Sequence, residues 1–172
     1  MPTVEANGIR INYRSDGADG APVLMLSNSL GTNLHMWDRQ VPQLSKRFRV
    51  VRYDTRGHGK TDAPAHPYTF AMLGQDAIAL MDALKLPKVR FCGLSMGGMI
   101  GMWLARNAPA RIEQLVLSNT AAKFGLPEIW NQRIAAVRTS GMKSITGAVI
   151  ERWFTKEFRE KSPNEIEPIV EM

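Results

Sequence analysis

The chain has 172 residues, 44% of them hydrophobic and 22% charged, with a net charge of +6, which is typical of one globular domain or of one domain with a small lid. The 22 Lys and Arg residues are scattered without a run of five like charges, which argues against a nucleic-acid-binding surface. No apolar run approaches the roughly 20 residues of a membrane span, and the first residues lack a signal-peptide pattern, so we expect a cytoplasmic protein without a membrane partner.

The first part of the chain predicts a β-hairpin followed by alternating strands and helices. Asn7 and Gly8 stand between two short alternating runs, and both residues tolerate the positive φ of a two-residue turn. Buried strands are expected at 22–28, 48–54, 88–94 and 112–120, and helices at 35–48, 70–86 and 96–109, the second of them capped by Thr69. This alternation predicts an α/β fold with a mostly parallel sheet and helices on both faces.

After Thr120 only helices are predicted. The first spans 126–141 and ends at Gly141, and the second spans 142–158 with an apolar stripe. Ser162, followed by Glu165 three residues later, forms a capping box that begins a third helix. We therefore assign residues 1–122 to the N-terminal part of an α/β core and residues 123–172 to a helical lid. Because this third helix begins so close to the last residue, we expect the chain to be truncated.

Gly93-Leu94-Ser95-Met96-Gly97 matches the pattern G-x-S-x-G between a predicted strand and a predicted helix. In that context the serine occupies a sharp turn, and its hydroxyl projects above the strand ends as a nucleophile. The backbone N–H of Met96 is one candidate donor for an oxyanion, and the N–H of Leu30, in the loop "SNSLGTN", is the second. The alternative is a glycine-rich turn with an idle serine.

The segments "LSNSLGTNLHMW", "RYDTRGHGKTDAP", "FCGLSMGGMIG", "LSNTAAKFGLPEIW" and "RWFT" resemble the α/β-hydrolase superfamily, and most closely its 3-oxoadipate enol-lactonases. The resemblance implies hydrolysis of an enol-lactone in aromatic catabolism, the β-ketoadipate pathway, with Ser95 as nucleophile and with no metal or cofactor. Such a substrate carries a carboxylate, so Arg133 and Trp153 are named as binding residues, with Arg152 beside them. A solvated helix face is the more frequent role of an arginine.

The acid and the base of a catalytic triad follow the nucleophile in this superfamily. The last histidine here is His66, however, and Asn119 occupies the position at which some relatives carry the acid. We do not expect His35, His58 or His66 to substitute for the base. Three interpretations stay open: the N-terminal piece of a serine hydrolase, a chain completed by a complementary C-terminal polypeptide, or a non-catalytic binding protein with a hydrolase fold. An esterase, another lactonase or a perhydrolase is the alternative within the superfamily. A homo-oligomer is also compatible, but it would not restore the triad.

Overall fold

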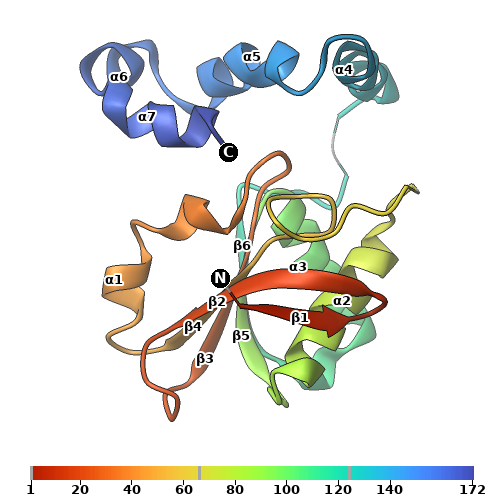
Figure 1. Cartoon of the computed structure of the whole chain (residues 1–172), viewed down its shortest axis with the longest axis vertical. Helices are drawn as coiled ribbons and strands as arrows, with labels where there is room; N and C mark the ends of the chain where they lie inside the picture. The colour runs from red at the N-terminus through yellow and green to blue at the C-terminus, as the bar shows by residue number, and fades with distance from the viewer. Residues whose placement is uncertain (1, 66, 124) are drawn as a thin grey trace. The chain divides into compact units, whose positions relative to one another are not determined.

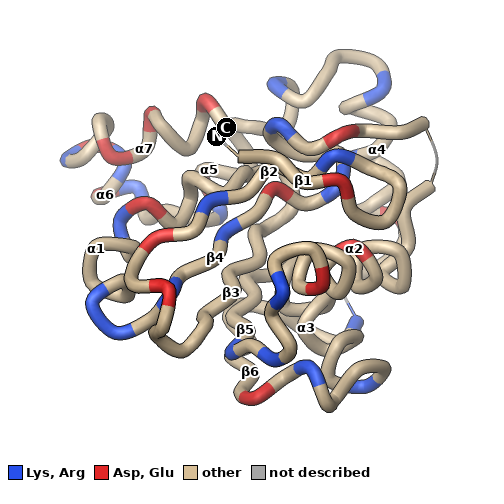
Figure 2. The backbone as a smooth tube through the Cα atoms, turned by 60° about the horizontal axis from the view of Figure 1, so that its bottom comes forward, with Lys and Arg blue, Asp and Glu red and all other residues tan. Residues whose placement is uncertain are grey.

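The computed structural model describes residues 2–65, 67–123 and 125–172. The chain folds into two compact units, Met1–Ala122 and Lys123–Met172, here called unit 1 and unit 2. Figure 2 shows Lys and Arg interspersed with Asp and Glu along both units. Within the described residues, no helix combines the length and the apolar character that crossing a lipid bilayer requires.

Unit 1 contains a six-stranded sheet in the order β1-β2-β4-β3-β5-β6 (Figure 1). The strands are β1 (Thr3–Ala6), β2 (Ile9–Asp16), β3 (Val23–Ser27), β4 (Arg49–Tyr53), β5 (Val89–Leu94) and β6 (Ile112–Ser118). The pairings of β1 with β2 and of β2 with β4 are antiparallel, whereas β4, β3, β5 and β6 are parallel. The predicted hairpin turn is confirmed, since Asn7 has φ 49° and Gly8 has φ 73°.

Helices cover both faces of this sheet, as predicted. One face packs against α2 (Phe70–Ala83) and α3 (Met96–Asn107), and the other packs against α1 (Val41–Leu44). Because successive residues of a strand point to opposite faces, Met25 belongs to the first buried cluster and its neighbour Leu24 to the second.

The predicted helix over 35–48 is wrong. The segment forms a 3₁₀ turn, η1 (Leu34–Trp37), and the separate short helix α1. Pro42 lacks an N–H and therefore lies in the first turn of α1 instead of continuing a longer helix. The side chain of Asn33 caps η1 by accepting the His35 N–H at 2.9 Å. By contrast, Thr69 caps α2 as predicted and accepts the Met72 N–H at 3.1 Å. A further 3₁₀ turn, η2 (Pro109–Arg111), precedes β6.

Unit 2 consists of α4 (Pro127–Ser140), α5 (Lys143–Trp153), α6 (Lys156–Lys161) and α7 (Pro163–Val170). Gly141, with φ 75°, ends α4 as predicted. The single helix predicted over 142–158 is wrong, because extended backbone at Thr155 separates α5 from α6 and its hydroxyl caps α6 at the Phe158 N–H, 3.2 Å away. Helix α7 begins after Ser162 as predicted, but the Ser162 side chain makes no capping hydrogen bond.

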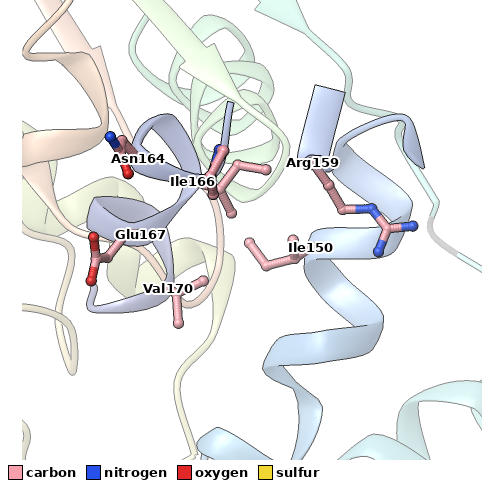
Figure 3. Close-up of a pocket in the computed structure, with 7 residues that line it drawn as sticks. Ile150, Arg159, Asn164, Ile166, Glu167 and Val170 are labelled. Carbon is pink, nitrogen blue, oxygen red and sulfur yellow. The ribbon is translucent and has the colours of Figure 1, made fainter. Parts of the chain in front are cut away.

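Unit 2 also holds an open pocket of about 420 Å³. It is lined by Ile150, Arg159, Pro163, Asn164, Ile166, Glu167 and Val170. Figure 3 shows the Ile150 side chain pointing from α5 toward α7, whereas the carboxylate of Glu167 points away from Ile150. All of these residues belong to unit 2, so the pocket involves none of the motif residues of unit 1.

Candidate active site

Ser95 lies between β5 and α3, the strand–turn–helix setting that its motif predicts. Its backbone has φ 54° and ψ −110°, a conformation that non-glycine residues rarely adopt and that costs of order 1–3 kcal/mol. The surrounding backbone is close-packed, since a Cβ on Gly93 would lie 2.1 Å from the carbonyl oxygen of Gly97. A Cβ on Gly97 would likewise lie 2.2 Å from the carbonyl oxygen of Ser27. Both glycines are therefore required by the space around the turn.

The end of β6 holds the backbone of Ser95 on both sides. The Ser95 N–H donates to the carbonyl oxygen of Ser118 at 2.9 Å. The hydroxyl of Thr120 donates to the carbonyl oxygen of Ser95 at 2.7 Å. Sequence reasoning missed Thr120, because a hydroxyl that acts on a residue 25 positions away leaves no local pattern. These two bonds keep the serine in its strained conformation.

The loop that follows β3 is attached to the first turn of α3. The Gly97 N–H donates to the carbonyl oxygen of Asn28 at 3.0 Å. The buried Asn28 side chain donates to the carbonyl oxygen of Tyr53 at 3.0 Å and accepts the indole N–H of Trp37 at 2.9 Å. The structure thus brings the loop of Leu30 beside the turn of Ser95.

Both candidate oxyanion donors lie in this region. Met96 is the first residue of α3, so its N–H precedes the first intrahelical hydrogen bond. Leu30 is 38% exposed and lies two residues after Asn28, in the loop attached to α3. Met96 therefore adjoins Ser95 directly, and Leu30 is two residues from the Asn28 carbonyl group that binds the first turn of α3.

His58 fastens the loop of Leu30 from the other side. Its Nε2 accepts the Gly31 N–H at 3.1 Å, so the ring proton lies on Nδ1, which donates to the carbonyl oxygen of Arg56 at 3.1 Å. The Arg56 guanidinium in turn makes two hydrogen bonds, of 2.7 and 2.6 Å, with the buried carboxylate of Asp76 on α2. The hydrogen bond with Asp76 raises the pKa of Arg56. Both nitrogens of His58 are therefore used to build the site.

The predicted binding residues Arg133 and Trp153 lie on α4 and α5 of unit 2. The Arg133 guanidinium lies 4.9 Å from the ring centre of Trp130, within cation–π distance. Burial lowers the pKa of Arg133, and the nearby positive charge of Arg152 lowers it further. Trp153 is 37% exposed. The positive charge of Arg152 in the same unit therefore acts on Arg133.

A family model described as alpha/beta hydrolase fold matches residues 22–157. The chain belongs to the alpha/beta hydrolase fold family. That finding confirms the fold class that the alternation of strands and helices and the G-x-S-x-G motif predict.

Several relatives of this hydrolase-fold chain are enol-lactonases, in line with the resemblance. It is 44% identical to "3-oxoadipate enol-lactonase 2" of Acinetobacter baylyi over 97% of this chain and 62% of the relative. The enol-lactonase structure from Burkholderia xenovorans LB400 matches with a TM-score of 0.96 and 49% identity, covering 99% of this chain and 66% of that one. A thermophilic esterase from Thermogutta terrifontis matches with a TM-score of 0.90 and 30% identity, covering 100% of this chain and 66% of that one. The chain spans 59 to 62% of the length of the two enol-lactonases of Acinetobacter baylyi.

In the part of the chain that the structure describes, the histidine and amide side chains that were considered as acid or base have other partners. The ring of His35 is paired with Asp38 through its Nδ1, 2.8 Å from the carboxylate, and His66 lies outside the described residues. Asn119 has φ 44°, and its amide oxygen lies 3.0 Å from the hydroxyl oxygen of Ser118. An amide cannot supply the negative charge with which a carboxylate orients a catalytic histidine.

Proposed function

We propose that this protein hydrolyses carboxylic esters and lactones with Ser95 as nucleophile, and that its substrate is 3-oxoadipate enol-lactone, an intermediate of aromatic catabolism. The observation that carries the proposal is the strained Ser95 turn, held between β5 and α3 next to the loop of Leu30. The names of the two Acinetobacter baylyi relatives support the choice of substrate.

In this mechanism the Ser95 hydroxyl gives its proton to the base, and its oxygen attacks the lactone carbonyl carbon to form a tetrahedral intermediate. The N–H groups of Met96 and Leu30 donate to its oxyanion, and the N-terminus of α3 favours the negative charge. Collapse of the intermediate breaks the ring C–O bond and leaves an acyl-serine whose enol oxygen takes the proton back from the base. Water then cleaves the acyl-enzyme and regenerates Ser95. No step requires a metal or a cofactor.

The acid and the base are proposed to come from sequence outside these 172 residues. In support, the rings of His35 and His58 are already engaged in other hydrogen bonds. The limited coverage of the enol-lactonase relatives also favours this proposal. A complementary polypeptide could supply the same groups. Without a base, a serine hydroxyl is a weak nucleophile at neutral pH.

Unit 2 is proposed to be a lid that binds the substrate carboxylate. Arg133 and Arg152 provide two positive charges near each other, and burial of Arg133 strengthens its attraction for an anion. Trp153 is proposed to supply apolar contact with the body of the substrate.

The experiment compares the protein encoded by the gene with its Ser95→Ala and Cys92→Ala variants. Hydrolysis of 3-oxoadipate enol-lactone and of p-nitrophenyl acetate is followed by absorbance, with circular dichroism to check folding. Ser95→Ala is expected to lose about 10⁴- to 10⁶-fold in kcat, whereas Cys92→Ala, in the strand β5 that leads to Ser95, keeps its activity. Wild-type turnover by Ser95→Ala would refute the nucleophile. Saturable lactone binding by a folded wild-type protein that hydrolyses neither substrate would instead favour the non-catalytic alternative.

A further inference from the structure

We infer that Thr120 is a positioning residue that aims the Met96 N–H at the oxyanion, an inference that rests on the proposed function. The hydroxyl of Thr120 donates to the carbonyl oxygen of Ser95 at 2.7 Å. That carbonyl group and the Met96 N–H belong to one peptide unit. Because a trans peptide unit is planar and its C=O and N–H point in opposite directions, fixing the oxygen fixes the direction of the N–H.

The Ser95 carbonyl oxygen is held by three donors. Besides the Thr120 hydroxyl, it accepts the Gly98 N–H at 2.9 Å and the Met99 N–H at 3.2 Å. The two backbone donors come from the first turn of α3 and move with the helix. The hydroxyl comes from outside α3, two residues after the end of β6, so it relates the peptide unit to the sheet.

The surroundings of Thr120 fit this role. Ser118 accepts the Ser95 N–H at 2.9 Å, so the residues on either side of Asn119 hold both polar groups of the serine backbone. Between them, Asn119 has a positive φ of 44°. Gly98 leaves room for the threonine, since a Cβ there would lie 2.5 Å from the Thr120 methyl carbon. A residue in a strained conformation persists only when its neighbours over-determine it.

A purely structural role predicts a different result from a positioning role. If Thr120 only stabilises the fold, its loss lowers the melting temperature and leaves kcat unchanged in the folded protein. If it aims an oxyanion donor, its loss lowers kcat and leaves KM unchanged, because the oxyanion forms only in the transition state.

The test uses the protein encoded by the gene and three variants of Thr120. Thr120→Val replaces the hydroxyl by a methyl group of similar shape, whereas Thr120→Ser and Thr120→Ala differ from each other only in the hydroxyl. Thr69→Val is the matched control, since Thr69 also makes one hydrogen bond with backbone but caps α2. Steady-state kinetics are measured well below the melting temperature of each variant.

Thr120→Val is expected to lower kcat about 10-fold, less than the loss of a whole oxyanion donor, with KM unchanged. Thr120→Ser keeps most of the activity, Thr120→Ala loses as much as Thr120→Val, and Thr69→Val loses stability only. If Thr120→Val does not fold, the comparison of Thr120→Ser with Thr120→Ala decides. Equal kcat values for Thr120→Ser and Thr120→Ala, together with an inactive Ser95→Ala, would overturn this inference and leave the proposed function intact. An active Ser95→Ala would overturn the proposed function itself.

Discussion

His58 accepts the Gly31 N–H on Nε2 at 3.1 Å and thereby holds the residue that follows Leu30. Its other ring nitrogen donates to the carbonyl oxygen of Arg56. The guanidinium of the same Arg56 is paired with Asp76 on α2. A histidine that binds the loop beside the Ser95 turn invites interpretation as a catalytic base. Here its hydrogen bonds connect two loops that build the site.

Replacement of His58 by leucine leaves the Gly31 N–H without its acceptor. We expect the free energy of unfolding to fall by about 1–3 kcal/mol, with a lower kcat in the folded protein because the loop of Leu30 loses its anchor. Urea unfolding and steady-state kinetics measure the two effects. His35→Leu is the control, since its exposed ion pair with Asp38 contributes at most about 1 kcal/mol. Equal effects of the two substitutions would contradict the anchoring role.

Two aspartates of α2 provide a direct comparison of a buried and an exposed ion pair. Asp76, 3% exposed, pairs with Arg56, and Asp82, 60% exposed, pairs with Arg111 at 2.7 Å. Asp76→Ala leaves a buried guanidinium unpaired and is expected to lower the free energy of unfolding by about 3–5 kcal/mol. Asp82→Ala is expected to lower it by at most about 1 kcal/mol. Chemical denaturation of both variants measures the two free energies of unfolding. An equal loss of stability in Asp82→Ala and Asp76→Ala would contradict the expected ranking.

The lowered pKa of Asp38 makes the free energy of unfolding depend on pH in the acid range. Burial would raise the pKa of its carboxyl group, but hydrogen bonds and charges from His35 and Arg52 outweigh burial and lower that pKa. A carboxyl group with a lowered pKa in the folded state contributes stability above its unfolded pKa of about 3.9, and this contribution is lost as pH falls through the folded pKa. The difference in unfolding free energy between wild type and Asp38→Asn should therefore shrink below about pH 4. Asp19→Asn, at a carboxylate 97% exposed, should show no such trend.

Two helical glycines should respond oppositely to the same substitution. A Cβ on Gly74 of α2 would lie 2.0 Å from the ring of Trp103, whereas a Cβ on Gly147 of α5 meets nothing within 4 Å. Gly74→Ala is expected to destabilise unit 1 by about 1–3 kcal/mol through overpacking of α2 against α3. Gly147→Ala should stabilise α5 by up to about 1 kcal/mol, because alanine favours helices over glycine. Thermal unfolding distinguishes the two signs, and a stabilising Gly74→Ala would show that Trp103 moves freely.

The elements that could be predicted from sequence are those with a local signal. The strands of the parallel sheet are short apolar runs, the turn at Asn7 and Gly8 has its own chemistry, and Ser95 carries a motif. The errors arose where one apolar pattern spans two short helices. At 142–158 the stripe continues through Thr155, whose hydroxyl caps a new helix instead.

The contacts that position the candidate site could not be predicted in this way. Asn28, His58 and Thr120 act on residues that are distant in the sequence and become neighbours only when the parallel strands pair. Their residue types are ordinary for loops, so no spacing distinguishes them. The motif locates the serine, and the sheet decides which side chains support it.

Arg133 provides the test of substrate charge. If its guanidinium, with that of Arg152, binds the carboxylate of an enol-lactone, Arg133→Gln should raise KM for the anionic lactone and leave kinetics with neutral p-nitrophenyl acetate unchanged. Loss of a hydrogen bond to a charged group corresponds to roughly a 10-fold rise in KM. Arg138→Gln, in the last turn of the same helix, controls for the loss of one positive charge. An equal loss of activity on the anionic lactone and on p-nitrophenyl acetate would mean that Arg133 instead supports α4 through its contact with Trp130. Equal effects of the two substitutions would mean that only the overall charge of unit 2 matters.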